Sequence, residues 1–414
     1  MSSISMFVGE HYDEASFIWL QRANANQAPN YDLTQFAELD ERLAAHIDGL
    51  RVAGDEGWRQ AEAALRNERP EDFFPAAVLA IEASNPRFDN LTERAEIAIE
   101  VIPGLISGLG WVPPEHLAGR VKSMLEDASP IKQMFGVAAC AMHRKDFQKL
   151  AEFLSSTDPK VRSRALRTAG ELGRRDLLGQ VKNAIADPKI EARFWATWSG
   201  VLLGDRKITL DALGTYALKS GTHQMRALQV SLFSMAPSIG HELLQQLPRS
   251  PDAERLRIIG TGYIGMVDDV PWLLEQMKQP HFARIAGEAF VNITGADFNL
   301  DQLESLPPED FEDGPTDDPD DENVEMPEDI ALPWPNQERI KTWWDTNNGR
   351  FKSSERYFLG VPVTREHCIH VLKEGFQRQR VAAALHLSLR HPGTQLFPTS
   401  APAWRQKRLL VEMV

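Results

Sequence analysis

The chain has few cysteines and no long apolar run, and these absences narrow its class. Its 414 residues include two cysteines, Cys140 and Cys368, which are too few for a disulfide framework and favour a reducing compartment. No uninterrupted apolar run reaches the roughly 18 residues of a membrane-spanning helix. The first 17 residues lack the basic start and apolar centre of a secretory signal. We therefore expect a soluble, cytoplasmic protein.

The chain also lacks the short motifs of common catalytic sites. It contains no HExxH zinc motif, no phosphate-binding glycine loop and no GxSxG nucleophile turn. Gly260, Gly262 and Gly265 match a GxGxxG pattern, but no predicted strand precedes them as a dinucleotide site requires. His367 and His370 lie three residues apart on one predicted helix, whereas a zinc site needs three or four ligands. No catalytic residue, cofactor or metal site is therefore predicted.

Charge is negative overall and unevenly distributed. The net charge is −14 at pH 7, and residues 309–329 hold twelve Asp and Glu and no Lys or Arg. Residues 330–414 hold 13 Lys and Arg against 6 acids. The acidic total argues against general binding to nucleic acid, which needs a concentrated basic face. One hypothesis is that the acidic stretch folds back over the basic segment and screens it. A solvated loop that docks nowhere is the alternative.

A repeat of about thirty residues organises residues 150–265. Its units share an acidic or Asp-Pro start and two closing glycines: Asp158-Pro159 with Gly170 and Gly173, Asp187-Pro188 with Gly200 and Gly204, and a weaker copy closed by Gly262 and Gly265. We expect the Asp to cap a helix, the Pro to occupy its first turn, and small residues to let neighbouring helices approach closely. A period of this length predicts a stack of helical pairs.

The spacing of charges within the repeat adds a family resemblance. Asp158 precedes Arg164 by six residues, and Asp187 precedes Arg193 by the same distance. This pattern resembles HEAT repeats, in which a turn Asp and a following Arg form hydrogen bonds between stacked units. The resemblance implies a structural ladder of these four residues that does no chemistry. It implies an all-α fold, a HEAT-like α-solenoid made of a superhelix of antiparallel helix pairs.

Four longer segments carry a wider resemblance. They are LDERLAAHIDGLRVAG (39–54), ARIAGEAFVNITG (283–295), RYFLGVPV (356–363) and GFQRQRVAAALHLSLRHPG (375–393). They resemble a proteobacterial family of HEAT-like proteins that are often encoded beside type VI secretion components. The resemblance implies a link to secretion, and it carries over no catalytic residue.

Composition divides the chain into four regions. Residues 1–145 read as N-terminal helical pairs, either degenerate repeats or a cap, and residues 146–295 as the HEAT-like repeats. Residues 296–335 read as an acidic, proline-rich disordered insert, and residues 336–414 as a basic helical segment.

The last region supplies the candidate partner-binding residues. Trp343 and Trp344 are adjacent, so a helix points them about 100° apart and one of them can serve as an interface anchor. Lys373, Arg378 and Arg380 are the candidate basic contacts. The alternative for both tryptophans is packing within the stack of helices.

These features favour a non-enzymatic protein that binds another protein as a scaffold, adaptor or chaperone, linked to type VI secretion. A more specific form is an immunity protein that binds a secreted toxin. The alternative from another class is an enzyme on a HEAT-like scaffold, similar to a bilin lyase or a DNA glycosylase. The acidic balance weakens the glycosylase alternative, and no cofactor signature supports the lyase.

Overall fold

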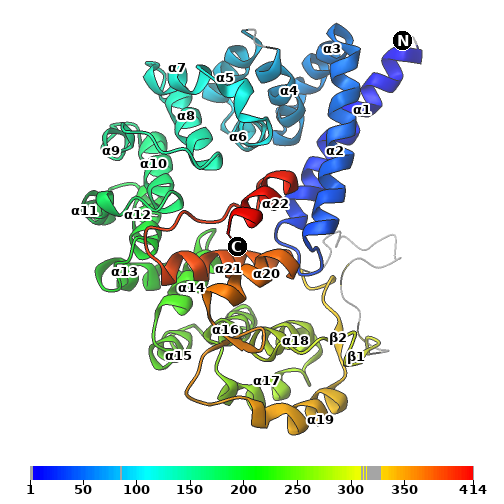
Figure 1. Ribbon diagram of the computed structural model, residues 1–414, viewed down its shortest axis with the longest axis vertical. Coiled ribbons are helices and arrows are strands. Elements are labelled where there is room, and N and C mark those ends of the chain that lie inside the picture. Colours follow the sequence, from blue (N-terminus) through cyan, green and yellow to red (C-terminus); the bar gives the residue numbers. More distant parts are fainter. Residues whose placement is uncertain (1–2, 84–85, 309–310, 312–313, 315–327, 414) are drawn as a thin grey trace. The chain divides into compact units, whose positions relative to one another are not determined.

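The computed structural model describes residues 3–83, 86–308, 311, 314 and 328–413 (Figure 1). Within these residues the chain forms 22 α-helices, several 3-10 turns and two antiparallel strand pairs. Strand β1 (Glu304–Ser305) pairs with β2 (Trp334–Pro335), and β3 (Tyr357–Phe358) pairs with β4 (Val361–Pro362). The predicted all-α class is therefore confirmed. No helix of the described residues is long and apolar enough to cross a membrane.

The helices fall into two compact units whose boundaries differ from the four regions inferred from composition. Unit 1 comprises residues 1–205 and 371–414, and unit 2 comprises residues 206–370. The expected boundary at residue 145 falls inside unit 1, and the basic C-terminal segment is divided between the units. Composition changes along the chain, whereas a compact unit is defined by which segments pack together. The two descriptions therefore need not coincide.

Unit 1 contains a row of helices in which each helix packs against the next. The row consists of α4 (Pro70–Glu82), α6 (Ile102–Trp111), α8 (Pro130–Met142), α10 (Pro159–Glu171) and α12 (Ile190–Leu202). A second set of helices packs beside the helices of this row: α5 (Arg87–Ile97), α7 (Arg120–Glu126), α9 (Leu150–Phe153) and α11 (Leu178–Asn183). The row is preceded by α1 (Ser3–Ala25), α2 (Leu33–Ala53) and α3 (Asp55–Ala64).

Unit 2 continues the same design with fewer helices. After α13 (Ile208–Ala217), its row consists of α14 (Gln224–Ser234), α16 (Pro251–Ile264) and α18 (Pro280–Thr294). The paired helices are α15 (Pro237–Gln245) and α17 (Val270–Gln276). Helix α19 (Gln337–Asn347) packs against α17, and α20 (Arg365–Glu374) contains the boundary between the units.

Small residues set the spacing of both rows, as the repeat predicts. A Cβ added at Gly170 of α10 would lie 2.9 Å from the Cα of Ser199 in α12. A Cβ added at Gly262 of α16 would lie 2.9 Å from the Cα of Ala289 in α18. Contacts this short leave no room for a side chain, so glycine allows the helices to pack this closely. Gly262 and its neighbour Gly260 thus belong to helix packing, inside α16.

The flanks of the expected disordered insert are part of the unit 2 core. Phe298, Leu303 and Leu332 are buried with the apolar residues of α16, α17 and α18, and β1 pairs with β2 across the insert. The expectation of a disordered region over all of 296–335 is therefore corrected for residues 296–308 and 328–335. A few well-placed apolar side chains are enough to fill a core, even in a segment of low average hydropathy. Most of the acidic centre lies outside the described residues.

In unit 2 a later segment crosses the C-terminal ends of the row helices. We call residues 356–360 the unit 2 strap. Arg356 donates to carbonyls that follow or end α14, those of Phe233 at 3.0 Å and Met235 at 2.8 Å. The Tyr357 N–H donates to the carbonyl of Gly265 after α16 at 2.8 Å.

The same strap continues to α18. The N–H groups of Leu359 and Gly360 donate to the carbonyls of Asn292 and Ile293 at 2.7 and 3.0 Å. A helix leaves its last four carbonyls without partners inside the helix. The unit 2 strap therefore supplies donors that the ends of α14, α16 and α18 require.

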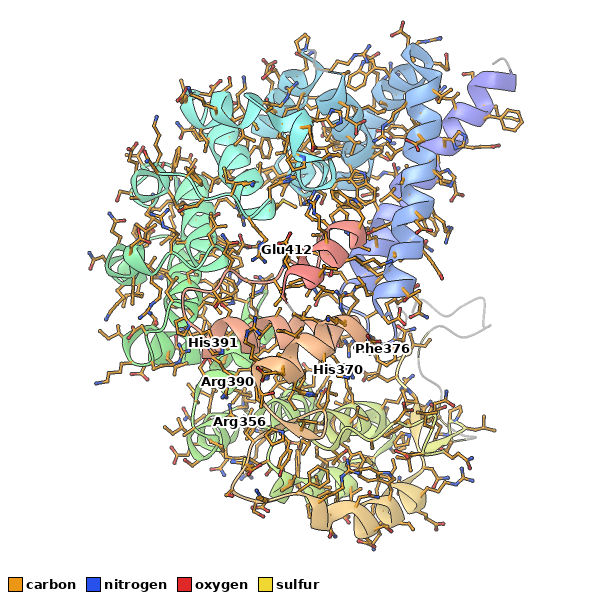
Figure 2. The ribbon with its side chains drawn as sticks, viewed as in Figure 1. Arg356, His370, Phe376, Arg390, His391 and Glu412 are labelled. Atoms are coloured by element: carbon orange, nitrogen blue, oxygen red, sulfur yellow. The ribbon has the colours of Figure 1, made fainter. Side chains whose placement is uncertain are left out.

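Unit 1 has an equivalent segment, residues 391–402, which we call the unit 1 strap. It joins α21 (Gln377–Arg390) to α22 (Ala403–Glu412), and both helices lie inside the curve that the other helices of unit 1 make (Figure 1). Phe376 and His391 mark the two ends of α21 in Figure 2. The start of α21 is joined to the α1–α2 loop, since the Gln377 N–H donates to the carbonyl of Tyr31 at 2.8 Å.

The unit 1 strap passes the ends of several row helices in turn. Gly393 lies against Gly173 after α10, and the Leu396 N–H donates to the carbonyl of Glu171 at 2.8 Å. Arg144, just after α8, donates to the side chain of Gln395 at 3.0 Å. The C-terminal edge of this row is thus also covered by the chain itself.

Candidate functional site

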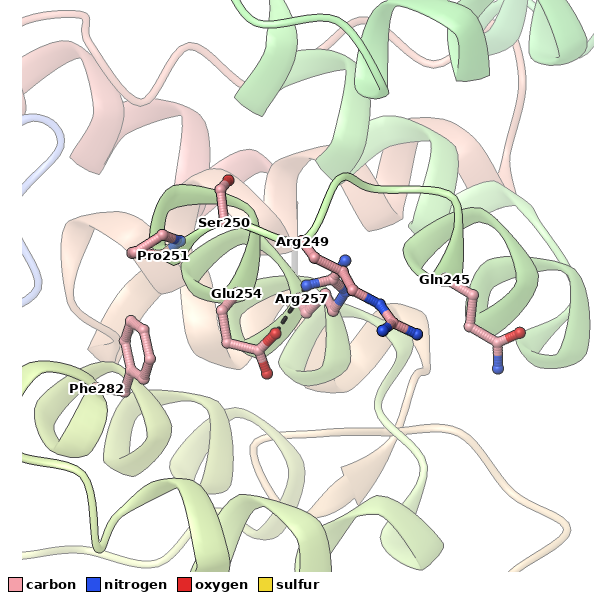
Figure 3. A pocket seen from close by; sticks show the side chains of 7 residues that line it. All are labelled: Gln245, Arg249, Ser250, Pro251, Glu254, Arg257 and Phe282. Carbon is pink, nitrogen blue, oxygen red and sulfur yellow. Dashed lines mark hydrogen bonds and ion pairs between the residues drawn. The ribbon is translucent and has the colours of Figure 1, made fainter.

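The opposite edge of the unit 2 row carries a groove of about 800 Å³ (Figure 3). Its lining residues come from the end of α15, the loop that follows, and the first turns of α16 and α18: Gln245, Arg249, Ser250, Pro251, Glu254, Arg257 and Phe282. The groove therefore lies at the N-terminal ends of two neighbouring row helices.

Local sequence explains how the groove is framed. Ser250 caps α16, because its hydroxyl accepts from the Ala253 N–H at 3.3 Å, and Pro251 occupies the first helical position. Helix α18 likewise begins at Pro280. The N-terminal turns of helices carry N–H groups without intrahelical acceptors, which favours negative charge nearby. Asp252 and Glu254 in the first turn of α16 offset part of this effect.

Two arginines of the groove differ in how firmly they are held. Arg257 donates to Glu254 at 2.7 Å and to the carbonyls of Leu247 and Pro248 at 2.6 and 2.8 Å. Arg249 is exposed and makes no hydrogen bond or ion pair within the described part of the chain. Arg257 is therefore committed to the structure, and Arg249 is the cation available to a ligand.

Phe282 gives the groove an apolar side. It is half-buried and packs against the unit 2 core from the first turn of α18. The close view places it on the far side of Glu254 and Pro251 from Gln245 (Figure 3). The groove can therefore contact both an acidic and an apolar group of a ligand. Its volume is in the upper part of the range of binding pockets.

The two predicted tryptophans lie elsewhere in unit 2. Both are half-buried and packed against Phe290 of α18, with ring centroids 5.6 Å from Trp343 and 6.5 Å from Trp344. Trp344 also stacks on Phe351, with centroids 5.7 Å apart. The structure thus places both residues on the core, and neither lines the groove.

The three predicted basic contacts do not share one environment. Arg380 is fully buried, and its guanidinium donates to the carbonyl of Leu372 at 2.8 Å and to the side chains of Gln377 and Gln406 at 3.0 and 2.5 Å. Burial lowers the pKa of Arg380 to about 10. Arg380 is therefore a core residue of unit 1, away from the surface that the sequence suggested for it.

The other two basic residues are half-buried. Arg378 donates to the carbonyl of Gln27 at 2.8 Å and so helps to join α21 to the α1–α2 loop. Lys373 has no hydrogen bond or ion pair among the described residues. Of the three, Lys373 is the one whose charge is not already used inside unit 1.

The predicted ladder of four residues is corrected to one link between repeats, which uses a different arginine. Asp187 pairs with Arg162 of the preceding repeat. The two carboxylate oxygens of Asp187 lie 2.5 and 3.1 Å from guanidinium nitrogens of Arg162, and this pairing lowers the pKa of Asp187. Arg193 donates to the main-chain carbonyl of Asp187 at 2.9 Å. Asp158 caps α10 as expected, accepting from Lys160 and Val161. The link between these two repeats, which both belong to unit 1, is therefore made by Arg162 and Asp187.

Arg164 has its partners inside its own helix. It donates to Glu171 at 2.6 Å, and Arg167 donates to the other oxygen of that carboxylate at 2.7 Å. Burial alone would raise the pKa of Glu171, but the two arginines hold it below its usual value. A six-residue spacing cannot show which face of the helix a side chain takes, and Arg164 faces Glu171.

The histidine pair does not form a cluster. His367 lies with Nε2 2.7 Å from the carbonyl oxygen of Phe358, Cys368 is fully buried, and His370 is exposed. Among the described residues no group of three or more His, Cys, Asp or Glu is arranged to hold a metal.

Comparison with known proteins leaves the geometry as the basis for assigning a function. No protein-family model matches the chain, and no curated protein matches it. The groove residues Arg249, Arg257 and Phe282 were not among those singled out from sequence. A signal was present, because Ser250-Pro251 is a helix start of the same kind as Asp158-Pro159.

Proposed function

We propose that the chain is a non-enzymatic protein-binding scaffold, a HEAT-like solenoid that holds a segment of a partner protein in the unit 2 groove. The observation that supports this most is the difference between the two edges of the unit 2 row. The chain's own strap occupies the C-terminal edge. The N-terminal edge carries the groove, with an exposed cation that has no partner in the described residues.

The lining determines the chemistry of the partner segment. Arg249 is placed to pair with an acidic side chain, while Phe282 offers a surface for an apolar one. An arginine and an aromatic residue are the side chains most often found at the energetic centre of protein interfaces. The groove therefore suits a segment with an acidic residue next to an apolar residue.

We propose a type VI secretion component or a secreted effector as the partner. The support is the resemblance of four segments, 39–54, 283–295, 356–363 and 375–393, to proteins encoded beside such components. If the partner is a toxin encoded beside this chain, the protein acts as its immunity protein. The binding site and its chemistry are the same in both cases.

The test is affinity capture from the native host, with partners identified by mass spectrometry. The wild-type chain is compared with the double variant Arg249→Glu and Phe282→Ala, and with Lys219→Glu, an exposed lysine of unit 2 that does not line the groove. We expect a stoichiometric secretion component or toxin with the wild type and Lys219→Glu, and its loss with the double variant. Retention by the double variant, or no partner on the wild type, would contradict the proposal.

A further inference from the structure

Unit 1 contains a smaller cavity, of about 230 Å³, between α1, α4, α6 and its strap. Three aromatic residues form much of its wall: Trp19 stacks near Phe74 with centroids 6.1 Å apart, and Phe74 meets Trp111 edge-on at 5.8 Å. The polar lining residues are Arg22, Asn26, Ser107, Ser400 and Arg405. The described lining thus contains two guanidinium groups and no carboxylate.

One of the two arginines is neutralised by the protein. Arg22 pairs with the buried carboxylate of Asp40 and donates to the carbonyl of Ser400 at 3.0 Å. The second oxygen of Asp40 accepts from the Ala403 N–H at the start of α22, at 2.5 Å. Asp40 is therefore fully used in joining α1, α2 and α22.

Arg405 has no such counter-charge. It is only 5% exposed, and its one hydrogen bond in the described structure is from Nη2 to the carbonyl of Val112 at 3.3 Å. Its Nε and Nη1 have no partner there. Burial, and then the positive charges of Arg408 and Arg22, lower the pKa of Arg405 to about 10, so the group is still charged at neutral pH.

The neighbouring histidine is uncharged, so Arg405 remains the charged group without a counter-charge at this place in the described structure. His143 lies with Nε2 2.8 Å from the carbonyl oxygen of Leu109. Burial, and then the charge of Arg405, lower the pKa of His143 to about 4, so it is neutral at pH 7. A buried charge that lacks a partner is costly, and structures normally pair it.

We propose that this cavity binds a small organic acid, whose carboxylate pairs with Arg405 and whose apolar body lies against Trp19, Phe74 and Trp111. The volume corresponds to about eight water molecules at roughly 30 Å³ each, which suits an acid the size of phenylacetate. The mostly apolar wall disfavours phosphate, which would need many donors to replace its hydration. The same carboxylate chemistry is available from a free acid or from the C-terminus of a peptide.

The first experiment measures binding to the full chain by calorimetry. The probes are phenylacetate, inorganic phosphate, and a short peptide ending in Phe with either a free or an amidated C-terminus. The variants are Arg405→Gln and, as a control on the same helix, the exposed Arg408→Gln, which does not line the cavity. We expect saturable binding of phenylacetate or the free-carboxylate peptide to the wild type and Arg408→Gln. Binding to Arg405→Gln should be at least tenfold weaker.

A second pair of variants leaves Arg405 in place. Ala23 lines the cavity from an exposed position on α1, so Ala23→Trp should obstruct the cavity, whereas Asn24→Trp at the next, non-lining position should not. Preference for phenylacetate identifies a free acid as the ligand, and preference for the free-carboxylate peptide identifies a chain terminus. The proposal is overturned by equal affinity of Arg405→Gln and wild type, by tighter binding of phosphate, or by no binding of either carboxylate probe.

Discussion

Both units cover the C-terminal ends of their row helices with a later part of the chain, but the two straps differ in length and in what they enclose. The unit 2 strap uses three main-chain N–H groups, those of Tyr357, Leu359 and Gly360, and the guanidinium of its first residue, Arg356. In unit 1 the longer strap donates through the Leu396 N–H, Arg144 reaches the strap from the end of α8, and Arg405 of α22 reaches the carbonyl of Val112. The five residues of the unit 2 strap lie directly on the helix ends, whereas the last part of the unit 1 strap, up to the start of α22, lines the cavity that contains Arg405. A ligand-sized space thus occurs beside the unit 1 strap.

The largest expected effect comes from disturbing the main-chain strap of unit 2. Gly265 has φ +74°, and a Cβ there would lie 2.3 Å from the carbonyl oxygen of Tyr357. The substitution Gly265→Val combines backbone strain with this clash, so we expect unit 2 to lose about 4 kcal/mol of stability. Hydrogen exchange of peptides from unit 2, recorded at increasing urea concentrations, measures the loss in the free energy of unfolding.

The matched control for that variant is Gly179→Ala in α11. A Cβ at Gly179 meets nothing within 4 Å. Alanine has the higher helix propensity, so this variant should gain up to about 1 kcal/mol. Equal effects of the two substitutions would show that the unit 2 strap does not depend on close contact at Gly265.

The second effect is confined to unit 1 and depends on pH. His143 is neutral in the folded state because its pKa is held at about 4, while in the unfolded chain it protonates near its usual value. The unfolded chain therefore binds this proton before the folded chain does as the pH falls below about 6.5. The free energy of unfolding of unit 1 should fall by about 2 kcal/mol between pH 7 and pH 5. Hydrogen exchange of peptides from unit 1, recorded at increasing denaturant concentrations at pH 7 and at pH 5, checks this change. If His143→Gln kept the same pH dependence, another group would be its source.

The third effect is smaller and concerns the link between repeats in unit 1. A double-mutant cycle of Arg162→Ala and Asp187→Ala should give a coupling energy of about 1 kcal/mol or more, because the two groups pair directly and are mostly buried. The cycle of Arg164→Ala and Asp187→Ala should give a coupling near zero, since Arg164 bonds Glu171. A larger coupling energy for Arg164 with Asp187 than for Arg162 with Asp187 would contradict this link and favour Arg164, the arginine expected from the sequence.

Local signals in the sequence predicted much of the helical framework. The cap at Asp158 and the close packing at Gly170 and Gly262 depend on neighbours within the same repeat or the next one. Such features are set by short-range geometry, and a repeat displays them several times. For that reason they were accessible without a structure.

The features that could not be predicted depend on contacts between distant parts of the chain. Arginine is a residue type that usually lies at the surface. Arg380 is nevertheless buried, because the side chains of Gln377 and Gln406 offer acceptors in the interior. The pairing of Asp329 with Arg255, at the edge of the acidic insert, joins residues 74 positions apart. The hypothesis that the acidic stretch screens the basic segment concerns residues that lie mostly outside the described structure. It remains a hypothesis.

The central claim is that a partner binds at the N-terminal edge of the unit 2 row and not at the strap edge. The most direct test places a photo-crosslinking amino acid at Gln245, which lines the groove, or at Val361, which is exposed beside the unit 2 strap. Both variants are irradiated in the native host and their adducts identified by mass spectrometry. We predict a specific protein adduct from position 245 and none from position 361. An adduct from position 361 alone would contradict the account.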